Sequence, residues 1–236
     1  MNPHRRLLFV PNSVTAANIV VGFLSIVAAA DGRFNLAVYL LFSALMLDMT
    51  DGILARKLQA TSKFGQEMDS LGDSLSFCAA PAFLAYSALL APLHGIGVAL
   101  AASFVLAGVF RLARFNLTSN EHEKARWTTG VPTPIAAGYI MTLVLMRDRV
   151  PVPAAAFVVL LMAMLMLSRW HLPELRGRGA VTVALLIGIP NYLAVMIWPN
   201  WYTVGWWNAW NVVILLVART EARREEPEQD LASTPL

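Results

Sequence analysis

Residues 48–73 read DMTDGILARKLQATSKFGQEMDSLGD, and this stretch sets the organisation of the whole chain. Four aspartates, Asp48, Asp51, Asp69 and Asp73, lie here within a sequence that is otherwise strongly apolar. The first two are three residues apart and the last two are four apart, so on helices each pair projects from one face. A charged side chain at the centre of a membrane span costs about 2.5–3.5 kcal/mol on the insertion scale. We therefore expect these four carboxylates to serve a function.

A metal site is the function that this arrangement predicts. Converging carboxylates repel one another and stay partly protonated unless cations lie between them. Hard oxygen ligands favour Mg²⁺, Mn²⁺ or Ca²⁺ over zinc. The stretch therefore predicts a site for two divalent cations, with Mg²⁺ or Mn²⁺ as the working ions and Ca²⁺ as an occupant that does not support turnover.

The composition indicates an integral membrane protein. Of the 236 residues, 57% are hydrophobic and 14% are charged, whereas soluble domains carry roughly 25% charged residues. The apolar stretches are too long for buried helices of a soluble protein and too continuous for an outer-membrane barrel. The single cysteine, Cys78, excludes an internal disulfide framework and is expected to be a packing residue.

The apolar stretches predict an all-α fold with about eight transmembrane helices. The predicted spans cover residues 14–30, 34–55, 72–91, 95–116, 132–147, 151–168, 180–198 and 202–218. A short interfacial segment with Arg5 and Arg6 is expected before the first span. The alternative of a cleaved signal peptide fits less well, because Pro11, Asn12 and Asn18 interrupt the stretch that should then be plainly apolar.

The positions of the basic residues predict that both termini are cytoplasmic. With the N-terminus inside, all but three of the 18 lysines and arginines fall on the cytoplasmic side, leaving Arg33, Arg147 and Arg149 outside, as the positive-inside rule requires. This topology places the aspartates at the cytoplasmic end of the second span and the start of the third. We expect one transmembrane catalytic domain over residues 1–219 and a disordered cytoplasmic tail over residues 220–236.

The residues among the aspartates favour a pyrophosphate ligand. Gly52 has no side chain and permits a bulky ligand to approach closely, and Arg56 is able to bind phosphate with two parallel hydrogen bonds. Cations neutralise phosphate oxygens and stabilise a charged leaving group. The sequence contains no GxGxxG motif, P-loop or internal repeat, and no nucleic-acid partner is expected.

The stretch resembles the signature of the CDP-alcohol phosphotransferases, D-x2-D-G-x2-A-R-x8-G-x3-D-x3-D. Asp48, Asp51, Gly52, Ala55, Arg56, Gly65, Asp69 and Asp73 reproduce it with every spacing intact. The resemblance implies displacement of CMP from a CDP-linked lipid by an alcohol, in a homodimeric membrane enzyme. It implies that the four aspartates ligate two metals and that Asp73 also takes the proton of the attacking hydroxyl. It further implies that the CDP-lipid is contacted by Gly52, Arg56, Ser62, Gly65 and Asn18.

Other stretches resemble the phosphatidylserine synthase branch of that family, so the family core spans about residues 11–180. They are PNSVTAANIVVGFLSI (11–26), RLARFN (111–116), TGVPTPIAAG (129–138) and, more loosely, SRWHLPELRG (168–177). The branch implies CDP-diacylglycerol and L-serine as substrates at the inner (cytoplasmic) membrane, with the active site facing the cytoplasm. Arg111, Arg114 and Asn116 are the predicted serine site, because the serine carboxylate needs a cation; alternatively, both arginines only anchor the helix end at anionic headgroups.

Two other functions remain open at this point. The same chemistry could serve another acceptor, namely glycerol 3-phosphate, inositol phosphate or choline. A divalent-cation transporter would instead use membrane aspartates as an ion path, but it would require polar residues at mid-membrane depth in several spans. Here the acids gather at one end, beside Gly52 and Arg56.

Overall fold

A computed structural model describes residues 3–58, 60, 62–121, 127–173, 186, 188–211, 213 and 216. The chain forms two compact units. The first comprises Met1–Ala113 and Val131–Leu167, and the second comprises Arg114–Gly130 and Ser168–Leu236. The predicted tail over residues 220–236 and most of the stretch 174–187 lie outside the described residues.

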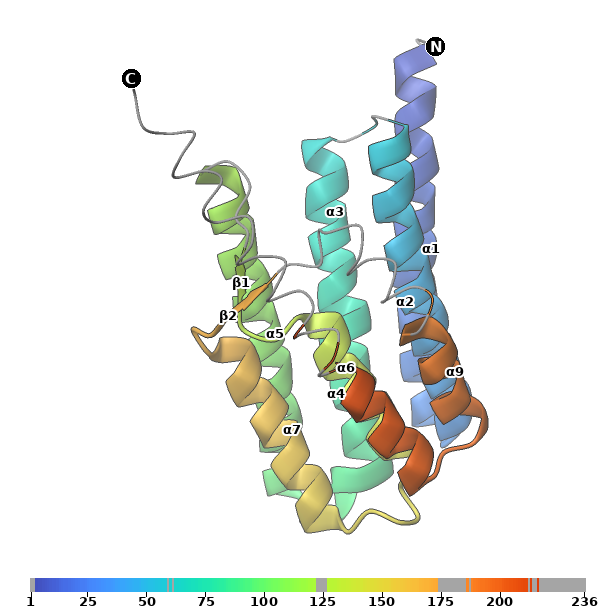
Figure 1. The fold of residues 1–236 in the computed structure, drawn as a ribbon, viewed down its shortest axis with the longest axis vertical. Helices are drawn as coiled ribbons and strands as arrows, with labels where there is room; N and C mark the ends of the chain where they lie inside the picture. The colour runs from blue at the N-terminus through green and yellow to red at the C-terminus, as the bar shows by residue number, and fades with distance from the viewer. Residues whose placement is uncertain are drawn as a thin grey trace. The chain divides into compact units, whose positions relative to one another are not determined.

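The first unit begins with a hairpin of two long helices, α1 (Pro3–Ala30) and α2 (Phe34–Lys57), which lie side by side (Figure 1). Gly32 ends α1 with a φ of 73°, a left-handed conformation that glycine adopts without steric cost. The amide of Gly32 donates to the Ala29 carbonyl at 3.1 Å, and the amide of Arg33 donates to the Ala28 carbonyl at 2.8 Å. These two bonds form a Schellman motif, which turns the chain directly into α2.

The third helical rod changes its winding along its length. It runs through α3 (Lys63–Asp73), the π-helical segment η1 (Ser74–Ala79), α4 (Ala80–Ala85), the π-helical segment η2 (Tyr86–Leu90) and the 3₁₀ turn η3 (Ala91–Leu93). The first π-helical segment starts directly after Asp73. Such bulges inside helices are frequent at functional sites. The predicted span of residues 72–91 therefore starts too late, because the polar first turns of α3 continue the same rod.

Of the remaining described elements, only α5 (Gly95–Glu121) is comparable in length to α1 and α2. The others are β1 (Trp127–Thr129), α6 (Thr133–Leu145), α7 (Val152–Leu167), β2 (His171–Pro173) and α9 (Ile189–Ile197). A further helical stretch covers residues 201–211. Pro132 caps α6 and a proline occupies its first turn, where the missing amide hydrogen costs nothing.

Four helices are long and apolar enough to cross a membrane: Phe9–Ala30, Phe34–Ala55, Lys63–Leu93 and Gly95–Leu117. Thr133–Leu145 and Val152–Leu167 are shorter apolar helices. The predicted class, a multi-pass helical membrane protein, agrees with these four helices. The predicted number of eight spans and the cytoplasmic position of both termini stay predictions.

One further detail of the predicted fold is wrong. The interfacial segment before residue 14 is not separate, because α1 is continuous from Pro3 to Ala30 with Pro11 inside it. A proline removes one backbone hydrogen bond, yet α1 continues through Pro11 and packs against α2. The predicted all-α class agrees with the structure, and the described residues add one short strand pair, in which β1 and β2 run antiparallel with Thr128 opposite Leu172. Three-residue strands joined by a distant connection leave no recognisable period in the sequence.

Glycines allow close packing around η1. A Cβ atom on Gly22 of α1 would collide with the Ser76 side chain, and one on Gly108 of α5 would collide with Cys78. Cys78 is fully buried, which agrees with its predicted packing role. Such small residues let helix backbones approach closely where lipid supplies no hydrophobic drive for association.

Candidate metal and substrate site

The two aspartate pairs of the motif come from neighbouring helices of the first unit. Asp48 and Asp51 lie in the last three turns of α2, and Asp69 and Asp73 lie in the second half of α3. One carboxylate oxygen each of Asp48, Asp51 and Asp69 lies within 4.8 Å of the other two. The predicted convergence of these three aspartates is therefore present in the tertiary structure.

Asp73 joins this group through Asp48, with which it forms a side-chain hydrogen bond. Its Oδ1 atom, like that of Asp69, is buried and has no hydrogen-bond partner in the protein. A buried polar atom without a partner costs about 1–3 kcal/mol. Divalent cations bound by carboxylate oxygens would remove that cost and the mutual repulsion. The donor set thus fits hard divalent cations.

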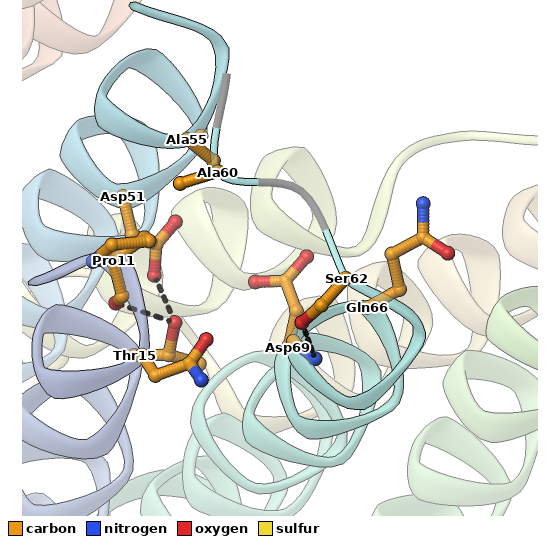
Figure 2. Close-up of a pocket in the computed structure, with 11 residues that line it drawn as sticks. Pro11, Thr15, Asp51, Ala55, Ala60, Ser62, Gln66 and Asp69 are labelled. Atoms are coloured by element: carbon orange, nitrogen blue, oxygen red, sulfur yellow. Dashed lines mark hydrogen bonds between the residues drawn. The ribbon is translucent and has the colours of Figure 1, made fainter. Parts of the chain in front are cut away.

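A pocket of about 90 Å³ lies beside these carboxylates. Figure 2 shows Asp51 and Asp69 facing one another across it, from α2 and α3 respectively. The lining residues come from the start of α1, the end of α2 and the start of α3: Pro11, Asn12, Thr15, Asp51, Gly52, Ala55, Ala60, Ser62, Gly65, Gln66 and Asp69. Its volume admits several water-sized groups, and its walls combine carboxylates with small side chains.

The turn from α2 into α3 presents a helix N-terminus to this pocket. Ser62 is the N-cap of α3, and its Oγ accepts a hydrogen bond from the Gly65 amide at 3.0 Å. The Ser62 hydroxyl hydrogen remains to be donated. A helix N-terminus favours anions because its amide groups and dipole point outward. The local sequence therefore places a phosphate-compatible element next to the aspartates.

Gly65 matters at the pocket because it has no side chain, and not because of an unusual backbone conformation. A Cβ atom at this position would lie 3.0 Å from Asn12 Oδ1 and 3.2 Å from Ser62 Oγ. Both distances are tighter than ordinary contacts, so a side chain here would push into the pocket wall. The predicted contact residues Gly52, Ser62 and Gly65 all line this pocket.

Two other predicted contact residues are not placed in this pocket. Arg56 belongs to α2, but its side chain lies outside what the structure describes. Asn18 is fully buried on α1, and its carbonyl accepts a hydrogen bond from Ser76 Oγ at 3.3 Å. Its side-chain amide has no hydrogen-bond partner in the protein. Asn18 therefore lies beside η1, one turn deeper along α1 than the described pocket lining.

The structure also brings residues into the site that the sequence analysis did not select. Asn12 and Thr15 from α1 and Gln66 from α3 all line the pocket. Thr15 Oγ1 donates to Asp51 Oδ2 at 2.8 Å, and both residues are buried. Asn12 and Thr15 fall in the stretch 11–26, so the signal was their polarity within an apolar helix.

The predicted acceptor residues lie on α5, and the structure gives its two arginines different surroundings. Arg111 is 8% exposed and belongs to the first unit. Gly108, one turn before Arg111 on α5, packs against Cys78 of η1, the segment that follows Asp73. Arg114 belongs to the second unit, where its Nη2 donates to the carbonyls of Thr129 and Ser168 at 3.2 Å each. Asn116 is partly exposed on the same helix.

Comparison with known proteins finds one family and relatives with related names. The family model described as CDP-alcohol phosphatidyltransferase matches residues 8–218. A CDP-diacylglycerol–serine O-phosphatidyltransferase of Helicobacter pylori is 39% identical over 147 residues, which are 62% of this chain and 62% of that protein. An archaetidylserine synthase of Methanothermobacter thermautotrophicus is 36% identical over 174 residues, 73% of this chain and 72% of that protein.

A third relative has the same named activity as the first. The CDP-diacylglycerol–serine O-phosphatidyltransferase of Bacillus subtilis is 36% identical over 135 residues, 57% of this chain and 75% of that protein. The matched region spans 62% of the length of the Helicobacter pylori relatives. Each of these relatives is named for a product or substrate that contains serine.

Proposed function

This chain belongs to the CDP-alcohol phosphatidyltransferase family, and from that membership we propose that it transfers the phosphatidyl group of CDP-diacylglycerol to L-serine. The products are phosphatidylserine and CMP. The observation that carries the proposal is the cluster of Asp48, Asp51 and Asp69 at a pocket formed by the family motif. The names of the relatives favour serine over glycerol 3-phosphate, inositol phosphate or choline as the acceptor. A cation transporter is disfavoured because the family is one of transferases.

In the proposed reaction the serine hydroxyl oxygen attacks the β-phosphorus of CDP-diacylglycerol. A new P–O bond forms, the P–O bond to CMP breaks, and CMP leaves with the bonding electrons. Asp73 accepts the hydroxyl proton, as a carboxylate within hydrogen-bonding reach of the nucleophile does in general base catalysis. Its buried Oδ1 without a protein partner is available for that contact.

We assign two divalent cations, Mg²⁺ or Mn²⁺, to the four aspartates. When bound, they would neutralise the pyrophosphate oxygens and the charge on the leaving CMP. The protein's own contribution is to hold the diphosphate between the carboxylate cluster and the start of α3. Ser62, Gly52 and Gly65 line that space, and we assign Arg56 and Asn18 to the same substrate.

For the serine site we favour Arg111 over Arg114 and Asn116. Arg111 is buried in the same unit as Asp73, and Gly108, one turn before it on α5, packs against Cys78 of η1, the segment that follows Asp73. A buried cation near the general base would bind the serine carboxylate and orient the hydroxyl toward Asp73. Arg114 donates to two backbone carbonyls, which favours a structural role for that side chain.

We further propose that the protein is a homodimer in the inner (cytoplasmic) membrane and that its site faces the cytoplasm. The acyl chains of the substrate would stay in the bilayer and enter between helices. Cys78 is buried and gives a low labelling background, so Lys57→Cys at the exposed end of α2 would report the orientation. Labelling of right-side-out vesicles by a membrane-impermeant maleimide only after permeabilisation would support this orientation; labelling of intact vesicles would contradict it.

The direct test is CMP release from CDP-diacylglycerol by the purified protein in detergent with Mg²⁺ or Mn²⁺. Serine, glycerol 3-phosphate, inositol phosphate and choline are offered separately. We expect release with serine alone, together with phosphatidylserine identified by mass spectrometry. Release with another acceptor would keep the aspartate chemistry and overturn the serine assignment, whereas no release with any acceptor would overturn both.

A further inference from the structure

Thr15 stands where three helices of the first unit meet at the aspartate pocket. It lies on α1 and is 4% exposed. Its hydroxyl points to Asp51 on α2, at 2.8 Å from Oδ2, and its methyl group lies 3.8 Å from where a Cβ on Gly72 of α3 would sit. Figure 2 shows Thr15 directed at Asp51 from the wall of the pocket. A buried β-branched side chain has few alternative rotamers.

The Thr15 hydroxyl has two acceptors within reach. The Pro11 carbonyl lies 3.1 Å away and Asp51 Oδ2 lies 2.8 Å away. A single hydroxyl hydrogen serves one acceptor at a time. A carboxylate is the stronger acceptor, and turning the hydrogen to Pro11 would leave two oxygens with lone pairs facing each other. The hydrogen therefore goes to Asp51.

This bond distinguishes the two oxygens of Asp51. Oδ2 accepts from Thr15, so this bond fixes the orientation of the carboxylate in the cluster with Asp48 and Asp69. Ligating carboxylates are commonly oriented by hydrogen bonds from outer residues, and loss of such a partner typically lowers metal affinity about 10–100-fold. Thr15 reaches Asp51 from α1 and both side chains are buried, so a valine at this position would leave Oδ2 without that donor.

We propose that Thr15 is a positioning residue that fixes the Asp51 carboxylate for divalent-cation binding. The inference rests on the proposed metal site, but not on serine as the acceptor. The Thr15 methyl group also matters, because a β-branched side chain has fewer χ1 rotamers than serine. Serine would make the same hydrogen bond with less restraint.

The test compares Thr15→Val, which keeps the shape and loses the hydroxyl, with Thr15→Ser, which keeps the hydroxyl. Ser25→Ala is the matched control, because Ser25 also lies buried on α1 and donates to a neighbour on α2, the Ala37 carbonyl at 2.9 Å. Binding of Mn²⁺ to each full-length protein in detergent is measured by electron paramagnetic resonance. The Mn²⁺ concentration that gives half-maximal CMP release is measured in parallel.

We expect Thr15→Val to weaken Mn²⁺ binding about 10-fold or more, with activity partly recovered at high Mn²⁺. Thr15→Ser should stay within about threefold of the parent protein, and Ser25→Ala should lower thermal stability without changing Mn²⁺ affinity. Unchanged Mn²⁺ affinity in Thr15→Val would overturn the proposal, as would equal losses in Thr15→Val and Thr15→Ser. A parent protein that binds no Mn²⁺ would overturn the inference and the metal site together. A normal Mn²⁺ result with no serine-dependent turnover would overturn only the acceptor assignment.

Discussion

The aspartate pocket of the first unit and the β1–β2 pair of the second unit both have charged side chains beside them, but the hydrogen bonds of these side chains differ. In the first unit, Oδ1 of Asp69, which lines the pocket, and Oδ1 of Asp73, four residues further along α3, are buried without a hydrogen-bond partner in the protein. At the strand pair, the Nη2 atom of Arg114 donates to the carbonyls of Thr129 and Ser168, and the Gly130 amide donates to the Trp170 carbonyl at 2.9 Å.

This difference favours a binding role for the carboxylates beside the pocket and a structural role for the Nη2 group of Arg114. Buried polar atoms are nearly always satisfied in folded proteins, so unsatisfied carboxylate oxygens at a pocket point to a ligand that supplies the missing charge. Arg114 instead completes the hydrogen bonds of chain segments that flank two short strands. The two arginines of RLARFN look equivalent in sequence, yet the bonds of Arg114 favour a structural role for it.

Of the predictions that test this difference, removal of divalent cations should have the largest effect on activity. Excess EDTA is expected to abolish CMP release, because the carboxylates then repel one another and cannot hold a diphosphate. Mg²⁺ or Mn²⁺ should restore release, whereas Ca²⁺ should bind without restoring it. The thermal unfolding temperature should also fall in EDTA. Full activity after dialysis against EDTA would contradict the metal site.

Replacement of the proposed base should have the next largest effect. Asp73→Asn keeps the shape of the side chain but cannot accept the serine proton, and general base catalysis contributes about 10²–10⁴-fold. We expect turnover to fall by about that factor, while size-exclusion behaviour in detergent remains that of the parent. Activity within a few-fold of the parent would remove Asp73 as the base.

A methyl group at Gly65 tests whether the pocket wall is tight. Gly65→Ala should raise the KM for CDP-diacylglycerol about tenfold, since one methylene in a binding pocket is worth about 1–3 kcal/mol. The unfolding temperature of Gly65→Ala should stay close to that of the parent protein, because alanine favours a helix by about 1 kcal/mol over glycine. Gly205→Ala is the control, since a Cβ there meets nothing within 4 Å and KM should not change. Equal KM values for both variants would show that the wall tolerates a side chain.

The smallest effect on catalysis is expected at Arg114. Arg114→Lys keeps the charge but loses the planar fork that reaches two carbonyls, and hydrogen bonds to charged groups contribute about 1.5–3 kcal/mol. We expect a lower unfolding temperature with a small change in the KM for serine, whereas Arg111→Lys should raise that KM clearly. A larger KM effect for Arg114→Lys than for Arg111→Lys would restore Arg114 as the serine ligand.

The sequence allowed the class of fold and the centre of the site to be predicted, because those signals are local. A long apolar run specifies a membrane helix by its own hydrophobicity. The spacing of Asp48 with Asp51, and of Asp69 with Asp73, places each pair on one helix face. The strand pair was missed because three-residue strands have no period, and the continuity of α1 was missed because Pro11 resembles a break.

Convergence was decided by the tertiary structure. The spacing within each aspartate pair does not state that Asp51 of α2 and Asp69 of α3 face one pocket; the packing of both helices against α1 does. The same packing brings Thr15 to Asp51 and Asn12 to Gly65. Helical periodicity fixes which side chains share a face, whereas contacts between faces depend on how the whole chain fills space. The sequence by itself thus determined which carboxylates are available on each helix face. The tertiary structure determined which carboxylates converge and which side chains of α1 contact them.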